Sequence, residues 1–131
     1  MERISVLVVE TDKAVLFMYR DLINSQNPGF DRFFVDNADK AKELIELRKF
    51  NILAVNYRLA SSNNETGITI ATKFREKNPK APIVILSSLI SDAQDEAKKN
   101  GLTNKVLFIR KPVIFSDLSK KLEKFLGIVP W

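Results

Sequence analysis

The chain has 131 residues, of which 45% are hydrophobic and 28% are charged. This length fits one compact domain with its own core, so we expect a single domain across residues 1–131. The sequence contains no cysteine and no histidine. Disulfides, thiolate chemistry and the usual transition-metal sites are therefore excluded, and any bound metal is expected to be a hard, oxygen-liganded ion such as Mg²⁺.

The net charge of +5 comes from 21 basic residues that are interleaved with 16 acidic ones. Because no basic run carries aromatic side chains, the charge indicates a solvated basic surface rather than a nucleic-acid site. No apolar run approaches the roughly 18 residues that cross a bilayer, and residues 1–5 lack the features of a secretion signal. We therefore predict a cytoplasmic protein that does not enter a membrane.

Short apolar runs alternate with amphipathic segments along the whole chain. Runs rich in β-branched residues predict buried strands, and a period near 3.6 residues predicts helices. The strands are expected at residues 4–9, 30–36, 51–56, 83–86 and 106–109. The helices are expected between residue 12 and a break at 27–29, and at 38–49, 67–77, 92–99 and 115–126. This alternation predicts a parallel sheet with helices on both faces.

Capping residues predict where several helices begin and end. Thr11 or Asp12 is expected to cap the first helix, Thr66 the third helix, which would start at Gly67, and Asp92 the fourth. Gly101 is expected to end the fourth helix in a left-handed conformation. The fifth helix has the clearest apolar stripe, at positions i, i+3, i+7 and i+10: Phe115, Leu118, Leu122 and Phe125.

The strand at 51–56 is expected to lie at the centre of the sheet, and it ends at the polar residue Asn56. In open α/β sheets, ligands bind and chemistry takes place at the carboxyl ends of the strands. Asn56 and the long loop at 57–66 are therefore the first place to look for function.

The chain resembles the receiver domain of bacterial two-component response regulators over essentially its whole length. The resemblance rests on five βα units of this size, on polar residues after four of the strands, and on Lys111-Pro112 after the fifth. It implies an α/β, flavodoxin-like (βα)₅ fold, a three-layer sandwich around a parallel five-stranded sheet of order 2-1-3-4-5. Strands one, three and four would then be central, which agrees with their uniformly apolar runs.

The resemblance also assigns positions in this sequence. The two acidic residues that hold Mg²⁺ in the family correspond to Glu10 and Thr11, and the phospho-accepting aspartate corresponds to Asn56. The other counterparts are the Ser or Thr after strand four, the aromatic residue of strand five and the Lys-Pro pair: Ser87, Phe108, Lys111 and Pro112. The loop at 57–66 is longer than is usual in the family.

The asparagine at position 56 changes the chemistry that the resemblance implies. A carboxylate can attack phosphorus, whereas the nitrogen lone pair of Asn56 is delocalised and its oxygen is a weak nucleophile. Neither Asn56 nor Thr11 carries a charge for Mg²⁺, so we expect at most weak binding at Glu10 and Asp12. The sequence therefore predicts a degenerate receiver, or pseudo-receiver. Such a module signals by protein contact, is not an enzyme, needs no cofactor and is not phosphorylated at Asn56.

Several residues have two interpretations on sequence alone. Asp12 either caps the first helix or forms an acidic pair with Glu10, since residues two apart in an extended segment face the same way. Lys111 either pairs permanently with Glu10 or contacts a phosphoryl group, as in receivers. Ser87 either caps local backbone or bonds a phosphoryl oxygen. Phe108 either packs in the core or changes rotamer on activation.

By resemblance, the expected partner surface is the face formed by helix 4, strand 5 and helix 5. Many receivers also dimerise through this face, so a homodimer is a second possible assembly. The basic residues expected there favour an acidic signalling protein as partner. They are Lys98, Lys99, Lys105, Lys120, Lys121 and Lys124.

Two other functions stay open. A phosphorylatable receiver in a phosphorelay would use a shifted acidic site, with Glu10, Asp12 and Mg²⁺, and another acceptor such as Glu65. A nucleotide or flavin binder on the same fold would need a phosphate-cradling loop after strand one, and residues 10–13 contain no glycine. We rank the nucleotide or flavin binder last.

Overall fold

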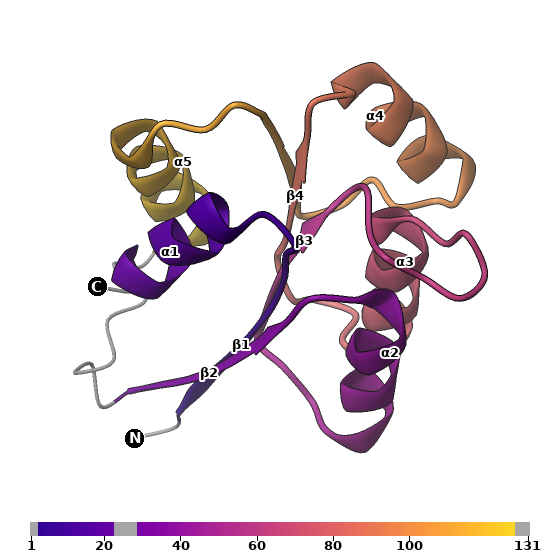
Figure 1. Cartoon of the computed structure of the whole chain (residues 1–131). Coiled ribbons are helices and arrows are strands. Elements are labelled where there is room, and N and C mark those ends of the chain that lie inside the picture. The colour runs from indigo at the N-terminus through magenta and orange to yellow at the C-terminus, as the bar shows by residue number, and fades with distance from the viewer. Residues whose placement is uncertain (1–2, 23–28, 128–131) are drawn as a thin grey trace.

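The computed structural model describes residues 3–22 and 29–127. Within these ranges, five strands alternate with five helices, as the sequence predicts (Figure 1). The strands are β1 (Ile4–Val9), β2 (Phe30–Val35), β3 (Ile52–Asn56), β4 (Ile83–Ser87) and β5 (Val106–Arg110). The helices are α1 (Lys13–Leu22), α2 (Ala38–Leu47), α3 (Gly67–Lys77), α4 (Ile90–Lys99) and α5 (Phe115–Leu126).

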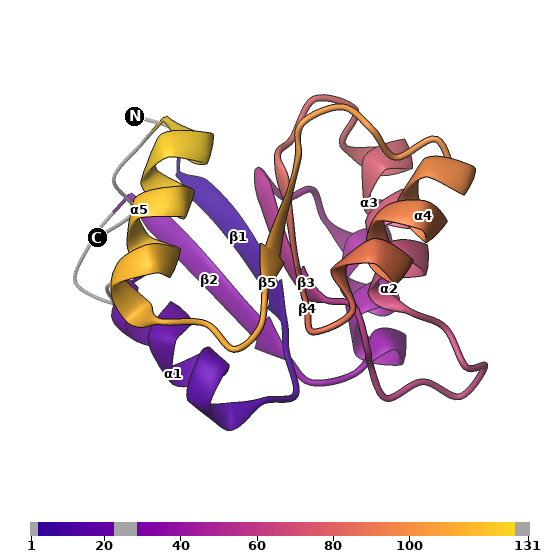
Figure 2. The same ribbon diagram turned by 90° about the horizontal axis from the view of Figure 1, so that it is seen from above.

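The strands form one parallel sheet in the order β2-β1-β3-β4-β5, which confirms the predicted flavodoxin-like arrangement. Figure 2 shows α1 and α5 on one face of this sheet and α2, α3 and α4 on the other. The described residues thus form three layers with the sheet in the middle. Because all strands run in the same direction, their carboxyl ends lie along one edge.

The burial of each strand follows its position in the sheet. β1, β3 and β4 are buried along almost their whole length, whereas β2 and β5, at the two edges, are mostly half-buried. A strand that helices cover on both faces keeps every side chain from water, which explains continuous apolar runs such as residues 52–55.

Two apolar clusters, one on each face of the sheet, hold the helices in place. On the side of α2, α3 and α4, Leu53 of the sheet and Phe74 of α3 are fully buried. On the side of α1 and α5, Val8 lies in one cluster with Leu118 and Leu122. Burial of a side chain of this size contributes about 1.5–3 kcal/mol relative to its exposure to water.

The prediction that Asp92 caps the fourth helix is wrong. α4 begins at Ile90, its N-cap residue is Leu89, and no side chain caps it. The Ser87 hydroxyl accepts a hydrogen bond from the Leu89 backbone N–H at 2.8 Å, and this turn lets the helix begin earlier than expected. Asp92 instead lies exposed in the first turn, where its charge faces the positive end of the helix dipole.

The second helix is shorter than predicted. α2 ends at Leu47 rather than at residue 49, because Arg48 takes an extended backbone conformation. The Arg48 guanidinium then lies over the Phe33 ring, with its central carbon 4.1 Å from the ring centroid. This cation–π contact joins the end of α2 to the edge strand β2.

The fifth helix shows one further difference. Phe115 was expected to face inward but is 43% exposed, because it is the first residue of α5 and the helix reaches the core only one turn later. Leu118 and Leu122 are buried as predicted. The expected glycine ends of α4 and α5 are confirmed, since Gly101 and Gly127 both have a positive φ, 70° and 68°.

One expected feature lies largely outside the described residues. Of the helix break expected at 27–29, only Gly29 is described.

In the part of the chain that the structure describes, no helix is both long enough and apolar enough to span a membrane.

Candidate functional site

The carboxyl ends of the strands bring together the side chains that the sequence singles out. Val9 at the end of β1 pairs with Val55 in β3, so Glu10 and Asn56 follow on neighbouring strands. The register of β4 with β5 pairs Ser87 with Arg110, the residue before Lys111. Glu10, Asn56, Ser87 and Lys111 are thus brought to one edge of the sheet.

Glu10 is a buried carboxylate, only 2% exposed. Its Oε2 accepts hydrogen bonds from the backbone N–H groups of Thr11 and Asp12, at 2.9 and 3.0 Å. The Lys111 ammonium lies 3.1 Å from Oε1 and 3.3 Å from Oε2. A buried charge requires a counter-charge and hydrogen bonds, and Glu10 has both from its own chain.

Lys111 is therefore placed by β5 for this pairing. Its backbone N–H donates to the Ser87 carbonyl at 2.9 Å, which ties the start of the β5–α5 segment to β4. The peptide bond between Lys111 and Pro112 is cis. Of the two interpretations open for Lys111, the structure supports the ion pair with Glu10.

Asn56 is buried at the end of β3, and its amide group faces local backbone. The side-chain Nδ2 donates a hydrogen bond to the Arg58 carbonyl at 2.7 Å. The start of α3 packs against the backbone of this residue. A Cβ atom built on Gly67 would lie 2.2 Å from the Asn56 carbonyl oxygen, so only glycine fits there. Asn56 is thus fixed by the turn that follows it and by α3.

The remaining counterparts have structural contacts of their own. Ser87 is buried, and its hydroxyl accepts the Leu89 N–H in the turn before α4, as the capping interpretation expects. Phe108 is half-buried and packs against the core cluster on the side of α2, α3 and α4. Thr11 is exposed and contacts Glu10 through its backbone.

Asp12 acts as the cap of the first helix. Its Oδ1 accepts the N–H of Ala14 at 2.9 Å, and its side chain is exposed. Only its backbone N–H contacts the Glu10 carboxylate. The alternative in which both carboxylates form an acidic pair is therefore not the arrangement that the structure shows.

The sequence matches the response regulator receiver domain family over residues 6–123. The chain belongs to this family. A search of curated proteins found no significant match.

Solved receiver structures share the fold at low sequence identity. The signal receiver domain of an HD domain-containing protein from Pseudomonas fluorescens is 17% identical, with a TM-score of 0.76, and the match covers 97% of this chain and 89% of that one. The receiver domain of a sensor histidine kinase from Pseudomonas aeruginosa, which has a magnesium ion in its active-site cleft, is 18% identical. Its TM-score is 0.70, with 96% of this chain and 99% of that one covered.

A third match comes from a family of redox sensors in the streptococci, described as having evolved from two-component response regulators. It is 19% identical, with a TM-score of 0.71. The match covers 95% of this chain but only 52% of that one. At these identities the three likenesses support the receiver fold alone.

The site of this receiver domain offers Mg²⁺ few charged oxygen atoms. Mg²⁺ prefers octahedral oxygen ligands and is usually bound through carboxylates. Oε2 of Glu10 accepts backbone N–H groups, whereas the buried Oε1 has no hydrogen bond and faces only the Lys111 ammonium at 3.1 Å. Asp12 caps α1, and Asn56 directs its NH₂ group to the Arg58 carbonyl. Among the described residues, no group of three or more acidic side chains is placed to hold a metal ion.

The long loop of this receiver domain is anchored to α2. The Ala38 N–H donates to the Ala60 carbonyl at 2.9 Å, and Glu65, 14% exposed in its side chain, forms an ion pair with Lys42 at 2.5 Å. The Glu65 carboxylate is thus engaged with α2. Between this loop and the start of α4 lies a cleft of about 350 Å³ that includes Tyr57, Thr66, Leu89 and Asp92 in its walls.

Sequence reasoning missed a polar contact on the far side of this cleft. Glu96 of α4 accepts hydrogen bonds from the Tyr57 hydroxyl at 2.8 Å and from the Thr66 hydroxyl at 2.5 Å. Thr66 was expected only as the cap of α3, which it also is, through the Ile68 N–H. The position of Tyr57 directly after Asn56 was the one available signal, and nothing in the sequence singles out Glu96.

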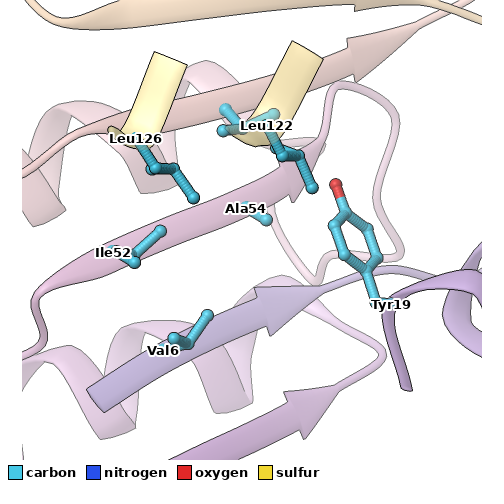
Figure 3. Close-up of a pocket in the computed structure, with 7 residues that line it drawn as sticks. Val6, Tyr19, Ile52, Ala54, Leu122 and Leu126 are labelled. Atoms are coloured by element: carbon cyan, nitrogen blue, oxygen red, sulfur yellow. The ribbon is translucent and has the colours of Figure 1, made fainter. Parts of the chain in front are cut away.

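Both tyrosines of this receiver domain have a raised pKa. Partial burial, and then the hydrogen bond to Glu96, raise the pKa of Tyr57 to about 12. Burial, and then the charge of Glu10, raise the pKa of Tyr19 above its ordinary value. Figure 3 shows the Tyr19 hydroxyl turned into a cavity beside Leu122 and Ala54, a space of about 20 Å³ with apolar walls.

Proposed function

We propose that this receiver domain is a pseudo-receiver, a signalling module that acts by protein–protein contact and is not phosphorylated at Asn56. The observation that carries the proposal is the state of the acceptor position. Asn56 presents a neutral amide whose NH₂ group is hydrogen bonded to the Arg58 carbonyl. An amide at this place cannot form the acyl phosphate that a carboxylate forms.

The neighbouring charges support the same proposal. Phosphoryl transfer needs cations placed to take up the charge that develops on the phosphoryl oxygens. Lys111 is the basic residue nearest Glu10 in the described structure, and its ammonium contacts both oxygens of that carboxylate. The pair is internally neutral, so neither residue offers its full charge to a metal ion or a phosphoryl group.

The alternative of a phosphorylatable receiver with a shifted acidic site has less support. Asp12 caps α1 and Glu65 is paired with Lys42. For either carboxylate to accept a phosphoryl group, the helix cap or the ion pair would first have to break. We therefore keep this alternative second, as the reading that the experiments must exclude.

The proposed partner surface is the face of α4, β5 and α5. The lysines expected there are all exposed, and the Lys105 ammonium also donates to the Lys80 carbonyl at 3.2 Å. Exposed acidic residues, among them Asp95, Asp117 and Glu123, lie on the same helices. A partner that is acidic opposite the lysines would fit this face, and a second copy of the chain is the competing occupant.

A related use of the fold adds support. The streptococcal redox sensors that match this chain are described as having evolved from response regulators. A receiver scaffold has thus been adapted to another input in those proteins. For this chain we propose the same principle, a retained fold with a different input, which would not be thiol chemistry because the sequence contains no cysteine.

A magnesium titration followed by backbone amide NMR tests the proposal at the site. For the wild-type protein we expect no saturable shifts in the amides of Glu10, Thr11 and Asn56 up to about 10 mM Mg²⁺, because Glu10 is ion paired with Lys111 and Asp12 caps α1. The Asn56→Asp variant, which adds a carboxylate, should show larger shifts at the same amides. Amides of α2, remote from the site, serve as the internal control for nonspecific ion effects. Saturable wild-type shifts with a midpoint below about 1 mM would contradict the proposal, since that affinity indicates a built cation site.

A further inference from the structure

The fourth helix is attached to the rest of the molecule by few contacts. It buries only small side chains, Ala93 and Ala97, and its first residue has no side-chain cap. Buried apolar area is the main source of attachment between a helix and a core, and alanine supplies little of it. The position of α4 therefore depends on whatever polar contacts it makes with its neighbours.

Those contacts are concentrated in Glu96. Its two carboxylate oxygens accept one hydrogen bond each, Oε1 from the Tyr57 hydroxyl and Oε2 from the Thr66 hydroxyl. Among the described residues, no other side chain of α4 is hydrogen bonded to, or ion paired with, another element. Hydrogen bonds to a charged acceptor are stronger than those between neutral groups.

The two donors are held rigidly. The backbone of Tyr57 donates to the Leu86 carbonyl of β4 and accepts from the Gly67 N–H of α3, at 2.8 and 2.6 Å. Thr66 is the N-cap of α3, and its hydroxyl oxygen accepts the Ile68 N–H at 3.2 Å while it donates to Glu96. Glu96 thus joins a loosely packed helix to the most firmly fixed part of the site edge.

We propose that Glu96, Tyr57 and Thr66 form a latch that holds α4 in one position, and that opening this latch changes the face offered to a partner. The latch residues Tyr57 and Thr66 also line the cleft of about 350 Å³ between the long loop and the start of α4. A group that bound in this cleft and took either hydroxyl would compete directly with Glu96. An input at the loop would in this way reach α4 without a phosphoryl group on Asn56.

The role of the latch in signalling rests on the proposed function, because α4 is part of the proposed partner face. The effect of the latch on α4 itself depends on no partner and on no phosphorylation. We expect α4 to open more easily once the Tyr57 hydroxyl, the Thr66 hydroxyl or the Glu96 carboxylate is removed. Local opening of a helix is read directly from the exchange of its backbone amides with solvent.

Amide hydrogen exchange of α4 tests the latch. In Tyr57→Phe, which removes one oxygen atom, and in Glu96→Gln, which removes the charge, we expect α4 amides to exchange about tenfold faster or more. The amides of β1, β3 and α2 should keep their wild-type rates. Asp95→Asn is the matched control, because it removes a carboxylate from the adjacent, exposed position of the same helix.

The double variant Tyr57→Phe/Glu96→Gln separates the latch from general loosening. If the two residues act through one contact, the double variant should exchange little faster than the more affected single variant, because their effects are not additive. The latch is refuted if α4 exchange changes less than twofold in both single variants, or if Asp95→Asn has the same effect. If Glu96→Gln raises amide exchange throughout the molecule, the α4 exchange rate of Tyr57→Phe alone tests the latch. A refuted latch would leave the proposal for Asn56 standing, since the magnesium titration reads a different site.

Discussion

A carboxylate buried at the end of a strand needs a counter-charge, and Glu10 obtains it from Lys111. Removing one partner of such a buried pair leaves an uncompensated charge, which costs about 3–5 kcal/mol. The ion pair, in which the Lys111 ammonium lies 3.1 Å from Oε1 of Glu10, therefore stabilises the carboxyl edge of the sheet. Asn56 adds no charge to this neighbourhood. At the scale of single residues, the site is neutral without any bound ion.

The tyrosine hydroxyls give a pH dependence that can be measured. The pKa of Tyr57 is raised from 10.0 to about 12, and that of Tyr19 is raised further by its burial. As pH rises above 10, the unfolded chain loses tyrosine protons that the folded protein keeps, so the folded state binds more protons. The free energy of unfolding contributed by these groups is therefore complete below pH 10 and decreases as pH rises toward 12.

Denaturant unfolding across this pH range, combined with tyrosinate absorbance, checks the pH prediction. The chain has only two tyrosines, so the absorbance reports on Tyr19 and Tyr57 alone. Folded protein should show no tyrosinate midpoint near 10.0, and Tyr57→Phe should lose part of the alkaline decline in stability. A tyrosinate midpoint at 10.0 while the protein is still folded would contradict the burial and hydrogen bonding described here.

At the scale of elements, β3 and α3 meet in a close contact between their backbones. The first residue of α3 touches the Asn56 backbone so closely that a side chain has no room. Close approach of two backbone segments is a main structural use of glycine. The sequence marked Gly67 only as a helix start after a capping threonine. The contact with Asn56 is a tertiary contact, and a local sequence pattern does not predict it.

Gly67→Ala should be strongly destabilising. The added Cβ would lie 2.2 Å from the Asn56 carbonyl oxygen, which is a backbone atom of β3 and cannot move as a flexible side chain could. Overpacking of this kind costs about 1–3 kcal/mol and sometimes more. Thermal or denaturant unfolding measures the loss. Gly101→Ala is the comparison, since nothing lies within 4 Å of its Cβ and only its positive φ opposes the change. A smaller loss for Gly67→Ala than for Gly101→Ala would contradict the close contact.

The positions of α4 and its contacts show where prediction from sequence failed. The buried positions of α4 are the alanines Ala93 and Ala97, and the expected cap at Asp92 placed the start of the helix two residues too late in the chain. The contacts of Glu96 could not be predicted, because its partners Tyr57 and Thr66 are 39 and 30 residues away in the sequence. The central strands were predicted well, because burial on both faces produces continuous apolar runs.

At the scale of the whole molecule, the sheet order and the layers followed from the alternation of elements and from the family resemblance. The pair between Glu10 and Lys111 was one of two readings that the sequence left open, and the structure supports it. The receiver fold forms with an amide at position 56, because the fold depends on the apolar runs and not on the site. The same edge of the sheet then becomes available for contacts such as that of Glu96 with Tyr57 and Thr66.

The central claim is that this receiver domain does not carry a phosphoryl group at its site. Intact-mass analysis after incubation with acetyl phosphate and Mg²⁺ tests it most directly, with the Asn56→Asp variant treated in parallel. We predict that the wild-type protein gains no phosphoryl adduct, because an amide stands at the acceptor position and the nearby carboxylates are engaged. An adduct on the Asn56→Asp variant would show that only the acceptor had been lost. A labile phosphoryl adduct on the wild-type protein would contradict the account and would direct attention to Asp12 and Glu65.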